Sequence, residues 1–157
     1  MRDDALAELA DRLRRDRRRH PHSGRREYSQ NVRALVTACE TLLAEGSAAR
    51  VAPVLRKAVD RITRALTYMD DSSGIVGDDL DDVMRLYALA CAEAPPSPGA
   101  LAKWLVGIEY DGPGRPRVRL RDFAPALGER GLSEVARLVE ARGDGGSGVV
   151  GGARGES

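Results

Sequence analysis

The sequence predicts an all-α protein of six to seven helices, paired as antiparallel hairpins in a helical-repeat-like stack or an irregular bundle. Apolar residues recur with the 3.6-residue period of a helix along most of the 157-residue chain. Aromatic residues make up only 4% of the chain, and its Ala- and Leu-rich composition favours helices over a β-sandwich or barrel. Clusters of Gly and Pro divide the chain into segments of helical length.

The first expected helix covers 2–19 and ends at the Pro- and Gly-containing segment 20–24. Its apolar positions are Ala5, Leu6, Leu9 and Leu13. The second helix is expected over 28–45, with Gly46 as its stop. One face of that helix carries Val32, Leu35, Val36, Cys39, Leu42 and Leu43. Both patterns bury one stripe of each helix.

The third expected helix, 48–69, keeps the apolar period for five turns and is the strongest in the chain. Its periodic positions run from Val51 to Met69. Ser47 is expected to be the N-cap. Because proline is tolerated best in opening turns, Pro53 leaves two starts open, at 48 or nearer Val51.

A loop over 70–77 precedes the fourth expected helix, 78–93, which ends at Pro95-Pro96. Its inward positions are Leu80, Val83, Met84, Tyr87, Ala90, Cys91 and Ala94. The fifth helix, 97–109, is expected to begin with Ser97 as N-cap and Pro98 at its first position.

Two shorter helices are expected over 120–127, ending at Gly128, and over 132–142. Short loops predict three hairpins: 28–45 with 48–69, 78–93 with 97–109, and 120–127 with 132–142. Three regions follow: an Arg-rich N-terminal helix and linker (1–27), a helical domain (28–142) and a disordered Gly-rich tail (143–157).

Eight arginines and one acid lie between Arg12 and Arg26, which gives this stretch a charge of +7. A guanidinium donates two hydrogen bonds to a phosphate, so the stretch is a candidate for binding a polyanion. The candidate residues are Arg14, Arg15, Arg17, Arg18, Arg19, Arg25 and Arg26. The alternative is a solvated helix end whose dipole favours cations.

Six aspartates and no base lie between Asp70 and Asp82, which gives this second stretch a charge of −6. Negative charge is unfavourable just after a helix C-terminus, so Asp70 and Asp71 need compensating donors. We expect a structural loop held by hydrogen bonds to the next helix, to turn residues or to an arginine. The residues of this loop are Asp70, Asp71, Ser72, Ser73, Gly74 and Gly77.

The sequence predicts neither a metal site nor a cofactor nor an enzyme. The aspartates do not match the spacing of an EF-hand loop, and the two histidines, His20 and His22, lack further ligands. No nucleophile and base stand in a catalytic pattern. Cys39 and Cys91 lie on apolar helix faces and are expected in the core, as are Tyr87 and Trp104. A ligand pocket is the alternative for the two aromatic residues.

The N-terminus lacks the apolar run of a secretory signal, and no apolar stretch reaches the length of a membrane span. Together with two cysteines that form no scaffold, this predicts a cytoplasmic protein without membrane association.

Four segments resemble the helical region of actinobacterial SWIM zinc-finger proteins: 65–78, 86–91, 101–105 and 124–131. The most specific match is Asp-Asp-Ser-Ser-Gly-x-x-Gly, followed by a Leu-Tyr-Ala helix. The Cys-x-Cys and Cys-x-His of the finger itself are missing, so the zinc site has no counterpart in this chain. The resemblance implies an all-α scaffold and supplies no catalytic residue.

We expect first a non-catalytic helical scaffold that binds a protein partner of unknown identity. The second hypothesis is a nucleic-acid-associated protein that uses Arg12–Arg26, and the third is an enzyme built on the aspartates. The net charge of +1 is nearly a cancellation of the +7 and −6 stretches. Pairing of these two stretches in the fold would make the charge pattern structural.

Overall fold

The computed structural model describes residues 1–14, 24–108 and 120–151, and in these ranges the chain is all helical and contains no strand. This confirms the predicted fold class. The elements are α1 (Asp3–Asp11), α2 (Arg25–Ala44), α3 (Ala48–Leu66), α4 (Ile75–Glu93), α5 (Pro98–Gly107), the 3-10 helix η1 (Leu120–Phe123) and α6 (Ala124–Gly151).

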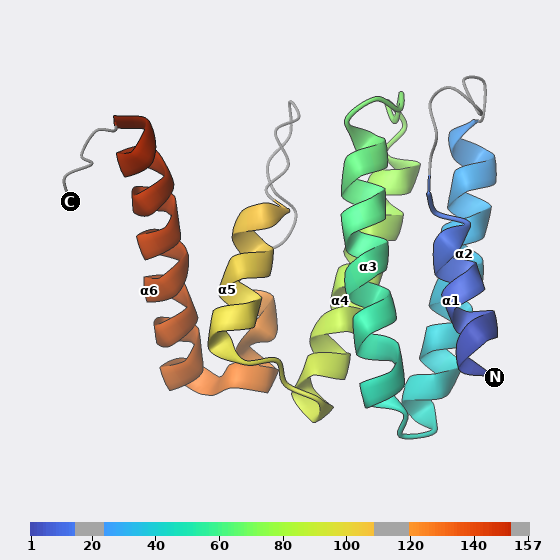
Figure 1. Cartoon of the computed structure of the whole chain (residues 1–157). Helices are drawn as coiled ribbons and strands as arrows, with labels where there is room; N and C mark the ends of the chain where they lie inside the picture. The colour runs from blue at the N-terminus through green and yellow to red at the C-terminus, as the bar shows by residue number, and fades with distance from the viewer. Residues whose placement is uncertain (15–23, 109–119, 152–157) are drawn as a thin grey trace.

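The helices stand in a row, from α1 and α2 at one end to α6 at the other (Figure 1). They form two groups. In the N-terminal group, α4 packs along α3 and α2, and α1 contacts α2 and α3. In the C-terminal group, α5 packs along α6. The two groups meet where α4 contacts η1 and α6.

The predicted hairpin of 78–93 with 97–109 is wrong. Helix α5 makes no close backbone contact with α4 and packs along α6 instead. Ala94 has a non-helical backbone conformation, and two prolines follow it. The prolines cannot continue α4, so this segment separates α4 from α5. Large side chains still connect them: the rings of Tyr87 and Trp104 lie 5.0 Å apart.

Local signals place most helix ends. Gly46 ends α2 with φ +82°, and Ser47 N–H donates to Leu42 O while Gly46 N–H donates to Leu43 O. These two bonds form a Schellman motif. Ser97 caps α5 as expected, because its Oγ accepts from Ala100 N at 3.2 Å.

Several helix boundaries differ from the prediction. Helix α1 ends at Asp11 rather than at 19, and α3 ends at Leu66 rather than at 69. Helix α2 begins at Arg25, three residues earlier than expected, and α4 begins at Ile75 rather than 78. Helix α3 begins at Ala48 and carries Pro53 inside it, so the start nearer Val51 is not used. Segment 1–27 contributes α1 to the common core, and residues 15–23 lie outside the described residues.

Gly128 separates a short first turn of α6 from its long second part, as the sequence predicts. Its φ of 68° and ψ of 175° are not helical and produce the kink at the lower end of α6 in Figure 1. The second part continues as helix to Gly151, whereas a disordered tail was expected from 143. The backbone hydrogen-bond ladder of α6 is extended through these residues, and 152–157 lie outside the described range.

The core runs through both groups and contains the residues predicted from helical periodicity. Leu6, Leu35, Leu55 and Phe123 are among its largest fully buried side chains. Cys39 and Cys91 are buried and free. Burial raises the pKa of the Cys39 thiol to about 12 and that of Cys91 above its usual value, so both thiols stay protonated at neutral pH.

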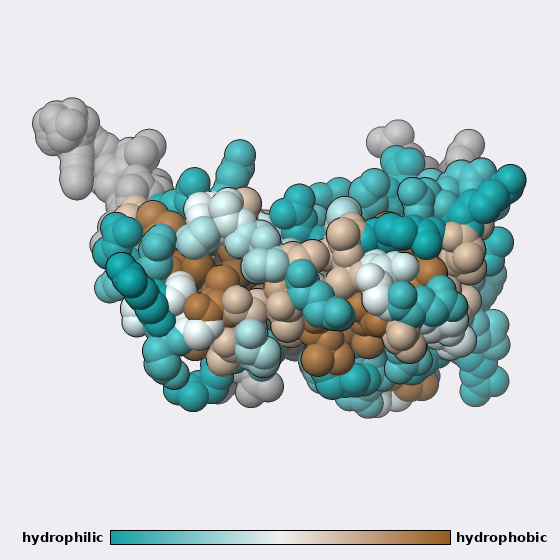
Figure 2. All heavy atoms as spheres, turned by 90° about the horizontal axis from the view of Figure 1, so that it is seen from below, coloured by the Kyte–Doolittle hydropathy of each residue, from teal (hydrophilic) through white to brown (hydrophobic). Residues whose placement is uncertain are grey.

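Seen from below, the surface carries hydrophilic side chains along its rim and apolar residues in two areas of the face (Figure 2). Leu89 is 48% exposed and Val106 is 36% exposed. Among the described residues, no helix is both long and apolar enough to cross a membrane.

Candidate functional site

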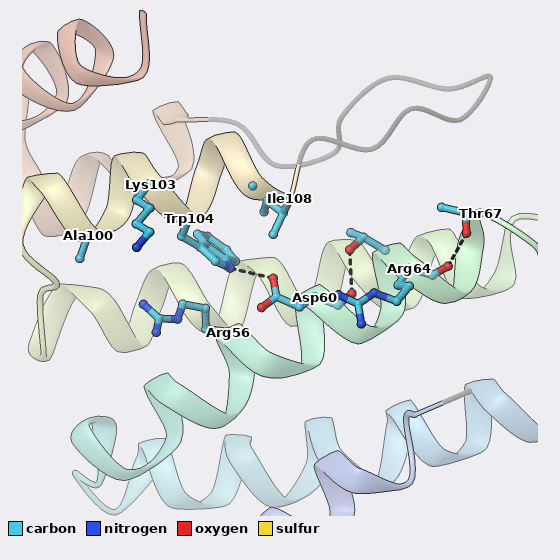
Figure 3. Close-up of a pocket in the computed structure, with 10 residues that line it drawn as sticks. Arg56, Asp60, Arg64, Thr67, Ala100, Lys103, Trp104 and Ile108 are labelled. Atoms are coloured by element: carbon cyan, nitrogen blue, oxygen red, sulfur yellow. Dashed lines mark hydrogen bonds between the residues drawn. The ribbon is translucent and has the colours of Figure 1, made fainter. Parts of the chain in front are cut away.

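An open groove of about 680 Å³ lies between α3 and α5, on the boundary of the two helix groups (Figure 3). One stripe of α3 and one stripe of α5 face each other across it, each at helical spacing. The described lining residues are Arg56, Asp60, Thr63, Arg64 and Thr67 from α3 and its C-cap, and Ala100, Lys103, Trp104, Gly107 and Ile108 from α5 and its C-cap. We call this feature the α3–α5 groove.

Among the residues that the structure describes, one hydrogen bond crosses the groove. The indole Nε1–H of Trp104 donates to Asp60 Oδ1 at 2.8 Å. No second hydrogen bond from a described residue reaches the other carboxylate oxygen, Oδ2. Burial raises the pKa of Asp60, although the bond from Trp104 and the charges of Arg56, Arg64 and Arg61 oppose this shift.

Three cations surround this bridge: Arg56, Arg64 and Lys103. In the part of the chain that the structure describes, none of the ion pairs involves any of them. Figure 3 shows Arg56 and Lys103 pointing into one end of the groove, whereas Arg64 lies on the other side of the bridge with its guanidinium turned toward Asp60. The described part of the groove therefore holds more positive charge than Asp60, the one carboxylate among its described residues, can balance.

An aromatic cluster lies behind the groove and joins the two helix groups. The rings of Tyr87, Trp104 and Phe123 meet edge to face, with centroids 5.0 to 6.4 Å apart. Burial and the neighbouring Cys91 raise the pKa of the Tyr87 phenol, and Arg56 lowers it. Trp104 is thus a core residue, as the sequence predicts, whose polar edge also reaches the groove.

The predicted loop over Asp70–Gly77 is held at the start of α4 by Asp71. Its Oδ1 accepts from Val76 N and its Oδ2 from Gly77 N, both at 2.9 Å. Asp70 Oδ1 accepts from Ser72 N at 3.1 Å, and Gly74 adopts a φ of 77°. Backbone N–H groups of the next helix were among the expected donors, and a carboxylate at a helix N-terminus is favourable. Ser73 is exposed.

The later aspartates of the acidic stretch bind α2. Asp79 is buried, accepts from Ser29 Oγ at 2.5 Å and lies 3.3 Å from Arg33 Nη1. Arg33 Nη1 also lies 2.6 Å from Asp82 Oδ2. The hydrogen bond that Arg33 donates to Asp82 raises the pKa of Arg33, so its guanidinium stays charged. Sequence periodicity missed the burial of Asp79, because its partners lie on another helix.

Of the candidate polyanion-binding arginines, Arg14, Arg25 and Arg26 are described and lie on both sides of the connection between α1 and α2. Arg14 and Arg26 are exposed. Arg15, Arg17, Arg18 and Arg19 lie outside the described residues, as do His20 and His22. In the ranges that are described, no cluster of three His, Cys, Asp or Glu side chains could hold a metal ion.

The sequence did not identify the cations of the groove as site residues. Arg56, Asp60 and Arg64 follow one another at four-residue intervals on α3, which is a polar stripe beside the apolar one. That spacing could have shown a shared face. Its partner helix could not have been found, because the sequence predicted that α5 pairs with α4.

Comparisons of the chain with protein-family models, with curated proteins and with solved structures gave no match. The resemblance to the SWIM-associated helical region therefore stays a prediction, and the groove is interpreted from its own geometry.

Proposed function

We propose that this chain is a non-catalytic helical scaffold that binds a protein partner in the α3–α5 groove. The observation that carries the proposal is an open groove at the boundary between two helix groups. Its described lining holds one interhelical hydrogen bond and three cations that share a single carboxylate, Asp60. Grooves between helices are common binding sites. The scaffold role also agrees with what the SWIM resemblance implies.

The lining favours binding over catalysis. Its one carboxylate, Asp60, already accepts from Trp104, and its two hydroxyl groups belong to Thr63 and Thr67. Both threonines donate to carbonyl groups of their own helix: Thr63 to Val59 O and Thr67 to Arg64 O. The remaining polar groups are cations, which bind an anionic surface without reacting with it.

Photo-crosslinking in the cells that make this protein tests the proposal. A benzophenone amino acid replaces Ala100, an exposed groove residue, or Glu40, an exposed residue of α2. We expect position 100 to crosslink a discrete protein that position 40 does not. That protein, once purified, should form a stable complex with the full chain in light scattering and lose it with R56Q/K103Q. Equal crosslinking at both positions, or equal binding by R56Q/K103Q, would contradict the proposal.

The second candidate function is nucleic-acid association through Arg12–Arg26. It is favoured by the exposure of Arg12, Arg14 and Arg26, none of which forms an ion pair with another described residue. Binding of a duplex oligonucleotide should then weaken steeply with salt, and R14Q/R25Q/R26Q should reduce that slope. Absence of binding at low salt would end this alternative.

A further inference from the structure

We infer that the α3–α5 groove recognises an acidic peptide segment in extended conformation, with two carboxylates about four residues apart. This inference rests on the proposed function and names the chemistry of the partner.

The first argument comes from the other arginines of this chain that lie at boundaries between helices. Arg33, Arg50 and Arg61 each reach a carboxylate on a different helix: Arg33 binds Asp79 and Asp82, Arg50 binds Asp3, and Arg61 binds Asp11. Each pair ties two helices together.

The cations of the groove lie on a helix boundary of the same kind, but the facing helix α5 offers no acid to them. In place of carboxylates, α5 presents Ala100, Lys103 and Trp104. Among the described lining residues, three cations and one carboxylate leave a formal charge of +2. Among the described residues, α5 supplies no carboxylate to complete this boundary, and we assign that role to an acidic partner.

The second argument is the spacing of the cations along α3. Arg56 and Arg64 are eight residues apart, which is about 12 Å along a helix. An extended chain rises roughly 3.3 Å per residue and directs side chains i and i+4 to the same side. Two acidic side chains four residues apart thus reach Arg56 with Lys103 at one end and Arg64 at the other (Figure 3).

The third argument is Asp60, which lies between these two ends. Its Oδ2 is available for a donor, and the backbone N–H groups of a peptide supply one between the two acidic side chains. A DNA strand carries a phosphate every ~3.4 Å of its axis, so one phosphate would face Asp60. This central carboxylate therefore favours a peptide over a nucleic acid.

Titration of the full chain with a synthetic peptide tests the inference. The probe is acetyl-Gly-Glu-Ser-Ala-Ser-Glu-Gly-amide, and the control peptide carries Gln at both Glu positions. Trp104 is the only tryptophan of the chain and lies at the groove, so its fluorescence reports occupancy there. We expect a saturable change with the Glu peptide that weakens with salt, and at least about a threefold weaker affinity for the Gln peptide.

Variants assign the effect to the groove. R56Q, R64Q and K103Q should each weaken binding about twofold to fivefold, and R56K should largely retain it. The matched control is K57Q, which removes an exposed charge one residue away from Arg56 and outside the groove lining. Circular dichroism confirms that each variant is folded.

Four outcomes overturn the inference: no binding of the Glu peptide, equal binding of the two peptides, an equal loss with K57Q, or tighter binding of a single-stranded oligonucleotide with the same dependence on Arg56, Arg64 and Lys103. If the peptide fails while crosslinking at position 100 succeeds, the groove binds a partner of different chemistry. If crosslinking also fails, the proposed function itself is wrong.

Discussion

Two effects oppose each other at Asp60. Burial disfavours the charged carboxylate, whereas the hydrogen bond from the Trp104 indole and three nearby arginines favour it. Its pKa is raised, so the folded protein binds this proton more tightly than the unfolded chain does. Ionisation of Asp60 therefore lowers the free energy of unfolding. This loss of stability grows as the pH rises from the ordinary carboxyl pKa of 3.8 through the raised pKa of Asp60. Asn at position 60 keeps an oxygen that can accept from Trp104 and removes the charge.

We therefore expect Asp60→Asn to be increasingly stable relative to the parent protein as the pH rises from acid to neutral, measured by urea unfolding at each pH. The two proteins should match most closely in acid, where Asp60 is protonated in both states. A relative loss of stability on going to neutral pH would show that attraction to Arg56, Arg61 and Arg64 dominates over burial.

Asp71 accepts hydrogen bonds from the N–H groups of Val76 and Gly77 and so caps the N-terminus of α4. Asp71→Ala should therefore lower the free energy of unfolding by about 1 to 2 kcal/mol, as the loss of other helix caps does. Asp70→Ala is the control, because the exposed Asp70 makes one local bond and should cost less. An unchanged melting temperature in Asp71→Ala would exclude a stabilising role for this loop.

At the scale of helices, local signals in the sequence could predict where elements lie but not which elements pair. The Gly46 stop, the Ser97 cap and the Gly128 break each depend on a few neighbouring residues, and the structure has all three. Pairing depends on contacts between distant segments. For that reason the packing of α5 on α6, and with it the groove, could not be predicted, although the cation stripe on α3 was visible.

The break in α6 predicts that replacing Gly128 lowers the free energy of unfolding. Its φ of 68° and ψ of 175° lie in a region that is essentially restricted to glycine. Gly128→Ala should destabilise the protein by about 1 to 3 kcal/mol. Gly99→Ala is the matched control, because Gly99 lies in α5 with open space around it and alanine should stabilise that helix by up to about 1 kcal/mol. Equal effects of the two substitutions on the urea midpoint would contradict this account.

For the whole molecule, the contact between the two helix groups is narrower than the packing within either group. The C-terminal group touches the rest through α4, the aromatic cluster and the Trp104–Asp60 bond. Cooperative units joined by few contacts open separately. Native-state hydrogen exchange should therefore show smaller opening free energies for α5 and α6 than for α3 and α4. Equal values in all four helices would indicate one cooperative unit.

Phe123 makes this division testable with one substitution. It is fully buried and packs edge to face against Tyr87, 5.7 Å away, and against Trp104, 6.4 Å away. Phe123→Ala removes packing worth about 3 to 5 kcal/mol at the boundary, while the core of α1 to α4 keeps its own contacts. The C-terminal group should then open while the N-terminal group stays folded.

In that variant, the fluorescence of Trp104 should shift to the red and amides of α5 should lose protection, while those of α3 keep theirs. Leu55→Ala, in the core of the N-terminal group, should instead lower protection in α2 to α4 as well. If Phe123→Ala lowers protection equally in all helices, the two groups fold as one unit. The α3–α5 groove would then be a fixed feature of that unit, because α5 could not move away from α3 unless both groups unfolded.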